Sequence, residues 1–489
     1  MSSSPERSSR PATPPVQLAS RHWLALAVLL CGAFLPILDF TIVNLALPSI
    51  RQDLHADSGD VQFVISAYAA TYAVMLITGG RLGDLYGRRR MFLSGAAGFV
   101  VASWVCGFAG SARLLLLGRI LQALAAAIMA PQVLATIRVM FAGKAQARAL
   151  GLYGATFGLA NIGGQLLGGL LIAMRPFGLG WQAIFLINVP IGIVAIVGGI
   201  FWLEESRSSR AKRLDVRGVL LLSVTLGCLV YPLIEGPTTG WPGWMMLMLA
   251  SSVVAFVGFI RHETHLSAHG GDPLVELSLF RTRRFSLGAA MGTVFYMLSA
   301  FYLTFSVYLQ GGLRASPQEA GLATLPFALG FFLSSIASPF IERRLATRTL
   351  VYGFVLQIVG FGAVVAGVVL PLFSPLAGGL VPGLACAGLG YGIVMPALIK
   401  AVLADVEERH AGLAAGVVMT ALQVGAALGV AVVGGIFYAA LGAHPDPGAY
   451  AHAFSLALAC NIALLGVGSI LAFLLPVAGA RSRRGATPS

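Results

Sequence analysis

Apolar runs of about twenty residues, the length that spans a bilayer, follow one another along most of this 489-residue chain. In the hydrocarbon core every backbone polar group needs a partner within the protein, so runs of this length are expected to form helices. A bacterial-type membrane barrel would instead show alternating strands of about ten residues. Only 10% of the residues are charged, compared with about 25% in a typical soluble domain. The sequence therefore predicts an all-α integral membrane protein.

Fourteen apolar runs can be delimited, and we expect each to form one transmembrane helix. The expected helices cover residues 23–46, 61–80, 91–110, 114–137, 149–173, 183–203, 218–235, 243–261, 286–310, 318–341, 348–370, 376–399, 411–438 and 453–476. Removing the pair at 218–261 leaves six helices on each side, which is typical of internally repeated transporters. The expected organisation is a disordered cytoplasmic tail at 1–22, an N-terminal six-helix bundle at 23–203, a linker with two inserted transmembrane helices at 204–285, a C-terminal six-helix bundle at 286–476 and a cytoplasmic tail at 477–489.

The basic residues predict the orientation of these helices. If the N-terminus is cytoplasmic, the segments on that side carry 27 of the 32 lysines and arginines, and the loops on the other side carry four. Cytoplasmic loops are enriched in Lys and Arg, so we expect a multi-pass protein of the inner (plasma) membrane with both termini cytoplasmic. The net charge of +13 is spread over short loops. It therefore indicates contact with the lipid bilayer rather than with nucleic acid.

Two ionisable residues, Asp39 and Arg119, are expected deep in the membrane. Such groups are costly there, about 2.5–3.5 kcal/mol on insertion scales, and are functional candidates by default. Burial favours the protonated carboxyl and a nearby arginine favours the charged one, so Asp39 is suited to exchange a proton. The alternative is a fixed ion pair that only tethers two helices. Asn44 and Gln122 could hydrogen-bond in the same cavity and contact substrate.

The segment GRLGDLYGRRR at residues 80–90 predicts a gate at the cytoplasmic face. Gly80 and Gly87 permit a tight turn and close backbone approach. Asp84 can cap a helix N-terminus or pair with an arginine, for which Arg81 and Arg88 are close in the sequence. Contacts of this kind could form in one conformation and break in another. The alternative is plain anchoring by positive charge.

Small residues form one face of the predicted helix 149–173. Gly164, Gly168 and Gly169 allow another helix to approach closely, either for gating or for generic packing. In the C-terminal half, aromatic and amide side chains are the candidate substrate contacts: Tyr296, Tyr302, Gln310 and Gln423. No phosphate-binding loop of the GxxxxGK[ST] type is present, and the HExH at 262–265 is not the zinc-protease spacing. We therefore expect no metal and no cofactor, with a proton gradient as the energy source.

Several stretches together resemble the fourteen-helix drug/proton antiporter group of the major facilitator superfamily. They are LDFTIVNLALPSI (38–50), GRLGDLYGRRRMF (80–92), LGRILQALAAA (117–127), GGQLLGG (163–169), WQAIFLINVPIG (181–192), LDVRGVLLL (214–222) and AGLAAGVVMTALQVGAALGVAV (411–432). The resemblance implies proton coupling through Asp39 and Arg119, and a cytoplasmic gate formed by Asp84 with Arg81 and Arg88. It also implies an antiporter helix shaped by its glycines, although Gln165 stands where the group usually has proline.

The leading hypothesis is proton-coupled efflux of hydrophobic or cationic small molecules, of the multidrug or antibiotic-resistance kind, by alternating access in a monomer. A second hypothesis is a dedicated exporter or importer of one metabolite with the same fold. A third, of another class, is a non-transporting membrane receptor or scaffold. An enzyme is not expected, because no nucleophile–base or metal constellation is visible.

Overall fold

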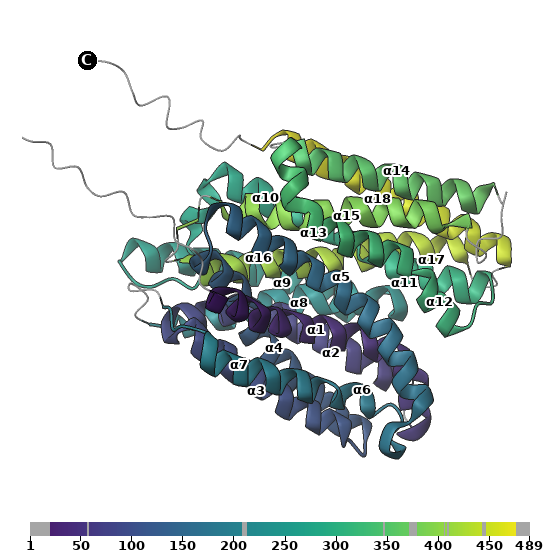
Figure 1. The fold of residues 1–489 in the computed structure, drawn as a ribbon, viewed down its shortest axis with the longest axis horizontal. Coiled ribbons are helices and arrows are strands. Elements are labelled where there is room, and N and C mark those ends of the chain that lie inside the picture. The colour runs from purple at the N-terminus through teal and green to yellow at the C-terminus, as the bar shows by residue number, and fades with distance from the viewer. Residues whose placement is uncertain are drawn as a thin grey trace, which may run out of the picture.

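The computed structural model describes residues 20–55, 58–207, 213–345, 348–370, 379–404, 406–407, 410–442 and 446–475, and these residues are overwhelmingly helical. Within them, fourteen helices are long and apolar enough to cross a membrane, which confirms the predicted fold class. Helices of the N-terminal half lie on one side of the molecule and those of the C-terminal half on the other (Figure 1).

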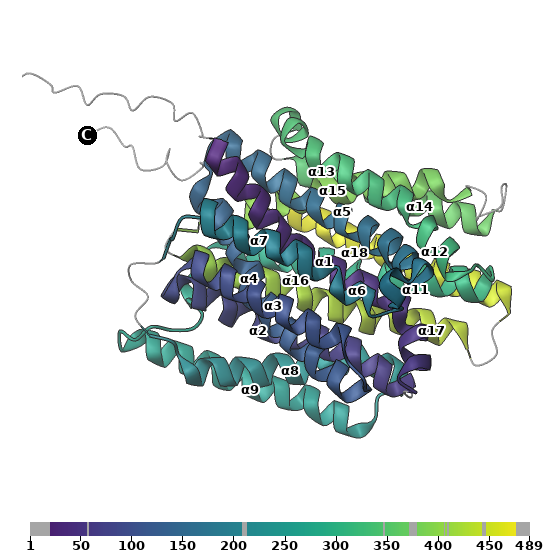
Figure 2. The ribbon, with the colours of Figure 1, turned by 60° about the horizontal axis from the view of Figure 1, so that its bottom comes forward.

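The first six spans are built from seven helices and a short 3-10 turn. They are α1 (Ser20–Asp53), α2 (Ser58–Tyr86), α3 (Arg88–Gly107), α4 (Ala112–Met140), α5 (Gly143–Met174), η1 (Pro176–Gly178), α6 (Ala183–Leu186) and α7 (Asn188–Trp202). Helix α4 packs against α2 and α3, while α1 packs against α5 and α7. The inserted pair follows as α8 (Val216–Thr239) and α9 (Gly243–Ala268). In Figure 2 this pair lies along one edge of the molecule beside α2.

The C-terminal half contains the remaining six spans, several of them interrupted. Its elements are η2 (Leu277–Arg281), α10 (Arg283–Met297), α11 (Ala300–Val307), η3 (Tyr308–Gly312), α12 (Pro317–Ala323), α13 (Leu325–Leu345), α14 (Thr349–Val369), α15 (Val381–Leu403), α16 (Ala411–Gly429), η7 (Val430–Gly434), α17 (Gly435–Leu441) and α18 (Pro447–Phe473). The two halves meet where α5 packs on α13 and α15, and where α16 packs on α2 and α4.

Polar side chains start several of these helices by satisfying backbone N–H groups that have no partner in the first turn. Ser111 accepts a hydrogen bond from Leu114 N at 3.3 Å, and Asp446 accepts one from Ala449 N at 2.6 Å. Asp215 accepts one from Gly218 N at 3.0 Å and so begins α8. These caps fix the residue at which each of these helices begins.

The segment at residues 80–90 differs from its prediction as a loop. Helix α2 continues to Tyr86 and α3 begins at Arg88, so Gly80 and Asp84 are helical and Gly87 alone makes the turn, with φ at 107°. The other glycines serve packing: a Cβ at Gly83 would overlap the Gln132 side chain. The helix therefore continues because its small residues fit against neighbouring helices instead of bending the chain.

Candidate functional site

Asp39 and Arg119 meet inside the N-terminal half. Asp39 lies on α1 and Arg119 on α4, and both side chains are fully buried, with 0% exposure. Arg119 Nη1 donates to Asp39 Oδ2, which makes a salt bridge between the two helices. Two opposite charges in the apolar interior stabilise each other, whereas either one alone would be expensive.

Two further polar side chains contact the Asp39 carboxylate, and Ser103 accepts hydrogen bonds from both of them. Gln122 Nε2 and Asn188 Nδ2 donate to Asp39 Oδ1 at 2.8 and 2.9 Å. Gln122 Nε2 also lies 2.9 Å from Ser103 Oγ, to which it donates, and Gln122 Oε1 accepts from Arg119 Nη1 at 2.8 Å. The carboxylate therefore accepts hydrogen bonds from side chains of α4 and α7. A change in its charge would alter its contacts with both helices. We call Asp39, Ser103, Arg119, Gln122 and Asn188 the α1–α4 polar cluster.

An aromatic ring completes the surroundings of Arg119. The guanidinium carbon lies 4.0 Å from the centroid of Tyr68 on α2, within the range of cation–π attraction. Tyr68 stacks in turn on Tyr72, with ring centroids 6.1 Å apart. Helix α2 is thereby connected to the charge state of the cluster, although it contributes no carboxylate to it.

Sequence reasoning identified Asp39, Arg119 and Gln122 but missed three partners, namely Tyr68, Ser103 and Asn188. Ser103 and Asn188 are polar residues in apolar runs, and this was the available signal for them, whereas Tyr68 lies among other polar residues of its helix. Gln122 was the easiest to place, since it lies three residues after Arg119 and therefore on the same helical face. The side chain of Asn44, another predicted contact, lies outside the described residues.

Asp84 connects the two halves of the molecule at the end that carries the basic turn. Its carboxylate accepts from Arg88 Nη2 at 2.8 Å, and from the backbone N–H groups of Gly412 and Leu413 at 3.2 and 2.8 Å. The latter two begin α16, so Asp84 on α2 caps a helix of the opposite half and faces its positive dipole end. We call the end of the molecule that carries Gly87, Arg88 and the start of α16 the basic end.

The backbones of α2 and α16 approach closely beside this cap. A Cβ at Gly80 would overlap the carbonyl of Gly412, and one at Gly416 would lie 3.0 Å from Ile77 Cα. Arg81 is buried on α2, three residues before Asp84. Glycine is thus required at Gly80 by a helix of the other half.

Helix α5 makes two kinds of contact along its length. Toward the basic end, a Cβ at Gly154 would lie 2.8 Å from Pro396 Cγ of α15, in the opposite half. Farther along, one at Gly164 would overlap Thr41 of α1, whereas one at Gly169 would meet nothing within 4 Å. Gly168 is buried, and the side chain of Gln165 lies outside the described residues. Of the three predicted glycines, Gly164 therefore admits a helix of its own half, and Gly169 admits none.

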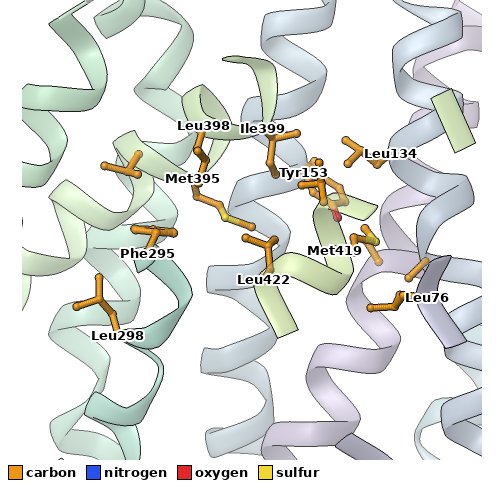
Figure 3. Packing of buried hydrophobic residues seen from close by; sticks show 14 of the residues in the cluster. Leu76, Leu134, Tyr153, Phe295, Leu298, Met395, Leu398, Ile399, Met419 and Leu422 are labelled. Carbon is orange, nitrogen blue, oxygen red and sulfur yellow. The ribbon is translucent and has the colours of Figure 1, made fainter. Parts of the chain in front are cut away.

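A hydrophobic cluster fills the space between the halves. In Figure 3, Tyr153 of α5 lies among Met395 and Ile399 of α15 and Met419 of α16, with Leu76 of α2 close by. Arg138 at the end of α4 also donates to the carbonyl of Val406. Together with the Asp84 cap, these contacts close the molecule at its basic end.

Of the substrate contacts predicted in the C-terminal half, Tyr296, Tyr302 and Gln423 are half-buried, while Gln310 is exposed and donates to Ser306 Oγ at 2.8 Å. An aromatic group lies around Tyr296 and Tyr302, and its central residue, Tyr391, was not among the predicted contacts. Tyr391 has ring centroids 4.4 Å from Phe295 and 4.8 Å from Phe331.

Two further acids, neither of them a predicted site residue, are buried in the inserted helix pair. Glu235 is 6% exposed and accepts a hydrogen bond from Ser66 Oγ of α2. The predicted helix ended at residue 235, but α8 continues to Thr239, so the carboxylate lies within the helix. Glu263 near the end of α9 is also buried and accepts from Val275 N at 3.1 Å.

Residues 29–430 match the family model described as Major Facilitator Superfamily. The chain is 37% identical over 431 residues to a probable actinorhodin transporter of Streptomyces coelicolor, covering 86% of this chain and 74% of that protein. It is 35% identical to the tetracenomycin C resistance and export protein of Streptomyces glaucescens, covering 90% and 80% of the two chains. With the puromycin resistance protein pur8 of Streptomyces alboniger the identity is 33%, and the coverage is 93% and 91%.

The fold also matches a solved structure. The crystal structure of the human organic anion transporter MFSD10 (TETRAN) superposes with a TM-score of 0.66 and 15% identity, covering 92% of this chain and 99% of that one. The family match, the relatives and the fold agree with one another and with the fourteen helices of the described residues that are long and apolar enough to cross a membrane. The chain is a multi-pass membrane transporter, not an enzyme, and it belongs to the Major Facilitator Superfamily.

Proposed function

We propose that this protein exports hydrophobic or cationic small molecules across the cell membrane in exchange for protons, with its basic end and both termini in the cytoplasm. The relatives named for antibiotic transport, export and resistance support export of antibiotic-like small molecules. The excess of lysine and arginine in alternate loops supports the orientation. The buried Asp39–Arg119 pair is the observation that carries proton coupling.

The proposed coupling step is protonation of Asp39. A neutral carboxyl no longer attracts Arg119, and it can accept fewer strong hydrogen bonds from Gln122 and Asn188. Because these donors lie on α4 and α7, their rearrangement changes the packing of the N-terminal bundle. In the cycle we propose, Asp39 takes a proton from outside and releases it to the cytoplasm, and substrate binds when the proton leaves. One charge crossing 100 mV supplies about 2.3 kcal/mol.

The proposed gate is the Asp84 cap on α16. Its hydrogen bonds join the two halves at the basic end, and with that end in the cytoplasm, as proposed, they would hold the transporter closed on the cytoplasmic side. Opening this end requires Asp84 to release Gly412 and Leu413. Rocking of two bundles about a central site is the usual motion in transporters with internal repeats.

Substrate flux driven by a pH gradient tests the coupling. In everted vesicles from a strain without its own efflux pumps, a dye or drug selected from a resistance panel should accumulate when the interior is acidic. Asp39→Asn should abolish this accumulation because the side chain can no longer change charge. Asp53→Asn, on the same helix but exposed and accepting from Trp181 Nε1 at 3.0 Å, is the matched control. Full accumulation by Asp39→Asn would refute the proposed coupling.

A dedicated exporter of one metabolite is the second candidate, favoured by relatives whose names each give a single antibiotic. The same resistance panel separates the two. Export of many unrelated aromatic or cationic compounds supports multidrug efflux, whereas export of one compound class supports the dedicated role.

A further inference from the structure

Glu235 is a buried carboxylate outside the α1–α4 polar cluster. It lies in the inserted helix α8 and accepts a hydrogen bond from Ser66 Oγ of α2, a residue that is itself fully buried. A glutamate within an apolar membrane helix is expensive, so its position calls for a role beyond packing. The mechanism proposed above makes no use of it.

Helix α2 lies between the Asp39–Arg119 pair and Glu235, and it contacts them through opposite faces. Its Tyr68 covers Arg119 of the polar cluster, whereas Ser66, two residues earlier, contacts Glu235. Two residues correspond to about 200° of rotation and about 3 Å of rise along a helix. Glu235 therefore meets α2 at nearly the same depth as the Asp39–Arg119 pair, but from the other side.

Helix α8 also covers the junction between the two halves. Its Val230 and Leu233 pack in one cluster with Ala73 of α2 and Ala427 of α16, with Ala431 of η7 against it. The contacted element η7 is a π-helical segment, a feature frequent at functional sites. Glu235 consequently lies in a helix that touches both halves where they are expected to move against each other.

Aromatic rings accompany the carboxylate. Tyr231 lies one helical turn before Glu235 on α8, and its ring centroid is 6.1 Å from that of Phe63 on α2 and 6.1 Å from that of Trp244 on α9. Phe63 and Trp244 are 40% and 51% exposed, so this group is open to molecules dissolved in the membrane. Aromatic faces and a carboxylate together are the chemistry that attracts organic cations.

We propose that Glu235, with Tyr231, Phe63 and Trp244, forms a second binding site, for the charged group of lipophilic organic cations, between α2 and the inserted helix pair. This inference rests on the proposed function, because it narrows the substrate class to one that a carboxylate can recognise. The site differs from the polar cluster in that its acid lies on an inserted helix and beside exposed aromatic rings.

Equilibrium binding to the full-length protein in lipid nanodiscs tests this site, with tetraphenylphosphonium as the cation and triphenylphosphine oxide as a neutral aromatic probe. Glu235→Gln should weaken tetraphenylphosphonium binding about tenfold, equivalent to about 1.4 kcal/mol, and leave the neutral probe unaffected. Glu235→Asp keeps the charge and should retain most of the affinity. Glu263→Gln, which neutralises a buried acid in the partner helix α9, is the matched control.

Three results would overturn the inference: no tetraphenylphosphonium binding by the wild-type protein, unchanged binding by Glu235→Gln, or equal weakening of both probes. Thermal unfolding of each variant in the same nanodiscs shows whether it is folded. If Glu235→Gln does not fold, binding of the two probes by Glu235→Asp is compared with binding by the wild-type protein. Binding at equilibrium needs no proton gradient. Failure of proton-coupled efflux would therefore appear in the vesicle assay and leave this measurement intact.

Discussion

The Asp39–Arg119 and Asp84–Arg88 pairs are both buried, yet they are built differently. The first pair lies wholly within the N-terminal half, and all of its described side-chain partners belong to that half. The second pair reaches across to the backbone of α16 in the other half. A proton can therefore act on the first pair without separating the halves, whereas opening the basic end must break the contacts of the second. In the proposed mechanism, the first pair therefore serves energy coupling and the second serves gating.

The largest effect is expected at Arg119. Replacing it by alanine leaves Asp39 as an uncompensated buried charge, which should destabilise the protein by about 3–5 kcal/mol. Arg119→Lys keeps the charge but not the planar donor geometry, so its loss should be smaller. Thermal unfolding of the purified variants in detergent measures both. If Asp39→Asn combined with Arg119→Ala were no more stable than Arg119→Ala, the loss would not come from the unpaired acid.

A smaller effect is expected at the gate. Asp84→Asn removes the charge from hydrogen bonds to Gly412 N and Leu413 N, which should weaken closure by about 1.5–3 kcal/mol. Ser335 is buried on α13 and faces Gly154 of α5, so it lies between the two halves. The readout is the rate at which a membrane-impermeant thiol reagent modifies Ser335→Cys in a background without the native cysteines. We expect the rate to rise at least about tenfold.

The control for this experiment is Asp215→Asn. Asp215 caps α8 by accepting from Gly218 N at 3.0 Å, but this cap lies within the inserted pair and joins no two halves. It should leave the reactivity of Ser335→Cys unchanged. Equal reactivity in both variants would show that Asp84 is an ordinary helix cap.

The smallest effect separates two glycines of α5. Gly164→Ala forces a methyl group against Thr41 of α1 and should destabilise the N-terminal half by about 1–3 kcal/mol. Gly169→Ala meets open space and should stay within about 0.5 kcal/mol of wild type. Chemical or thermal unfolding of both variants compares them directly. A larger loss at Gly169 would mean that this end of α5 packs against another helix during the cycle.

Much of this architecture could be predicted from the sequence, because hydrophobic length and charge asymmetry act locally along the chain. Asp39 and Arg119 could be found for the same reason: each is an isolated charge in an apolar run. The roles of Asn188 and Tyr68 could not be predicted, because their contacts with Asp39 and Arg119 depend on which helices lie side by side. Glu235 was missed since Pro237 and the glycines around it resemble a helix end, whereas α8 continues past them to Thr239.

The residues around Asp84, the proposed gate, show a second limit of prediction from the sequence. Asp84 was predicted to pair with an arginine or to cap a helix, and it does both, but the first backbone N–H group that it caps, that of Gly412, lies 328 residues later in the chain. The glycines before it suggested a turn, while Gly80 instead admits the Gly412 carbonyl. Local sequence therefore indicated the chemistry of this site correctly and its surroundings incorrectly.

Proton release on substrate binding tests the central claim most directly. Purified protein in weakly buffered detergent solution, protonated and then mixed with a transported substrate, can be followed with a pH indicator dye. We predict that the wild-type protein releases protons in proportion to the substrate bound, and that Asp39→Asn binds substrate without releasing them. Equal proton release by the two proteins would contradict the assignment of coupling to Asp39.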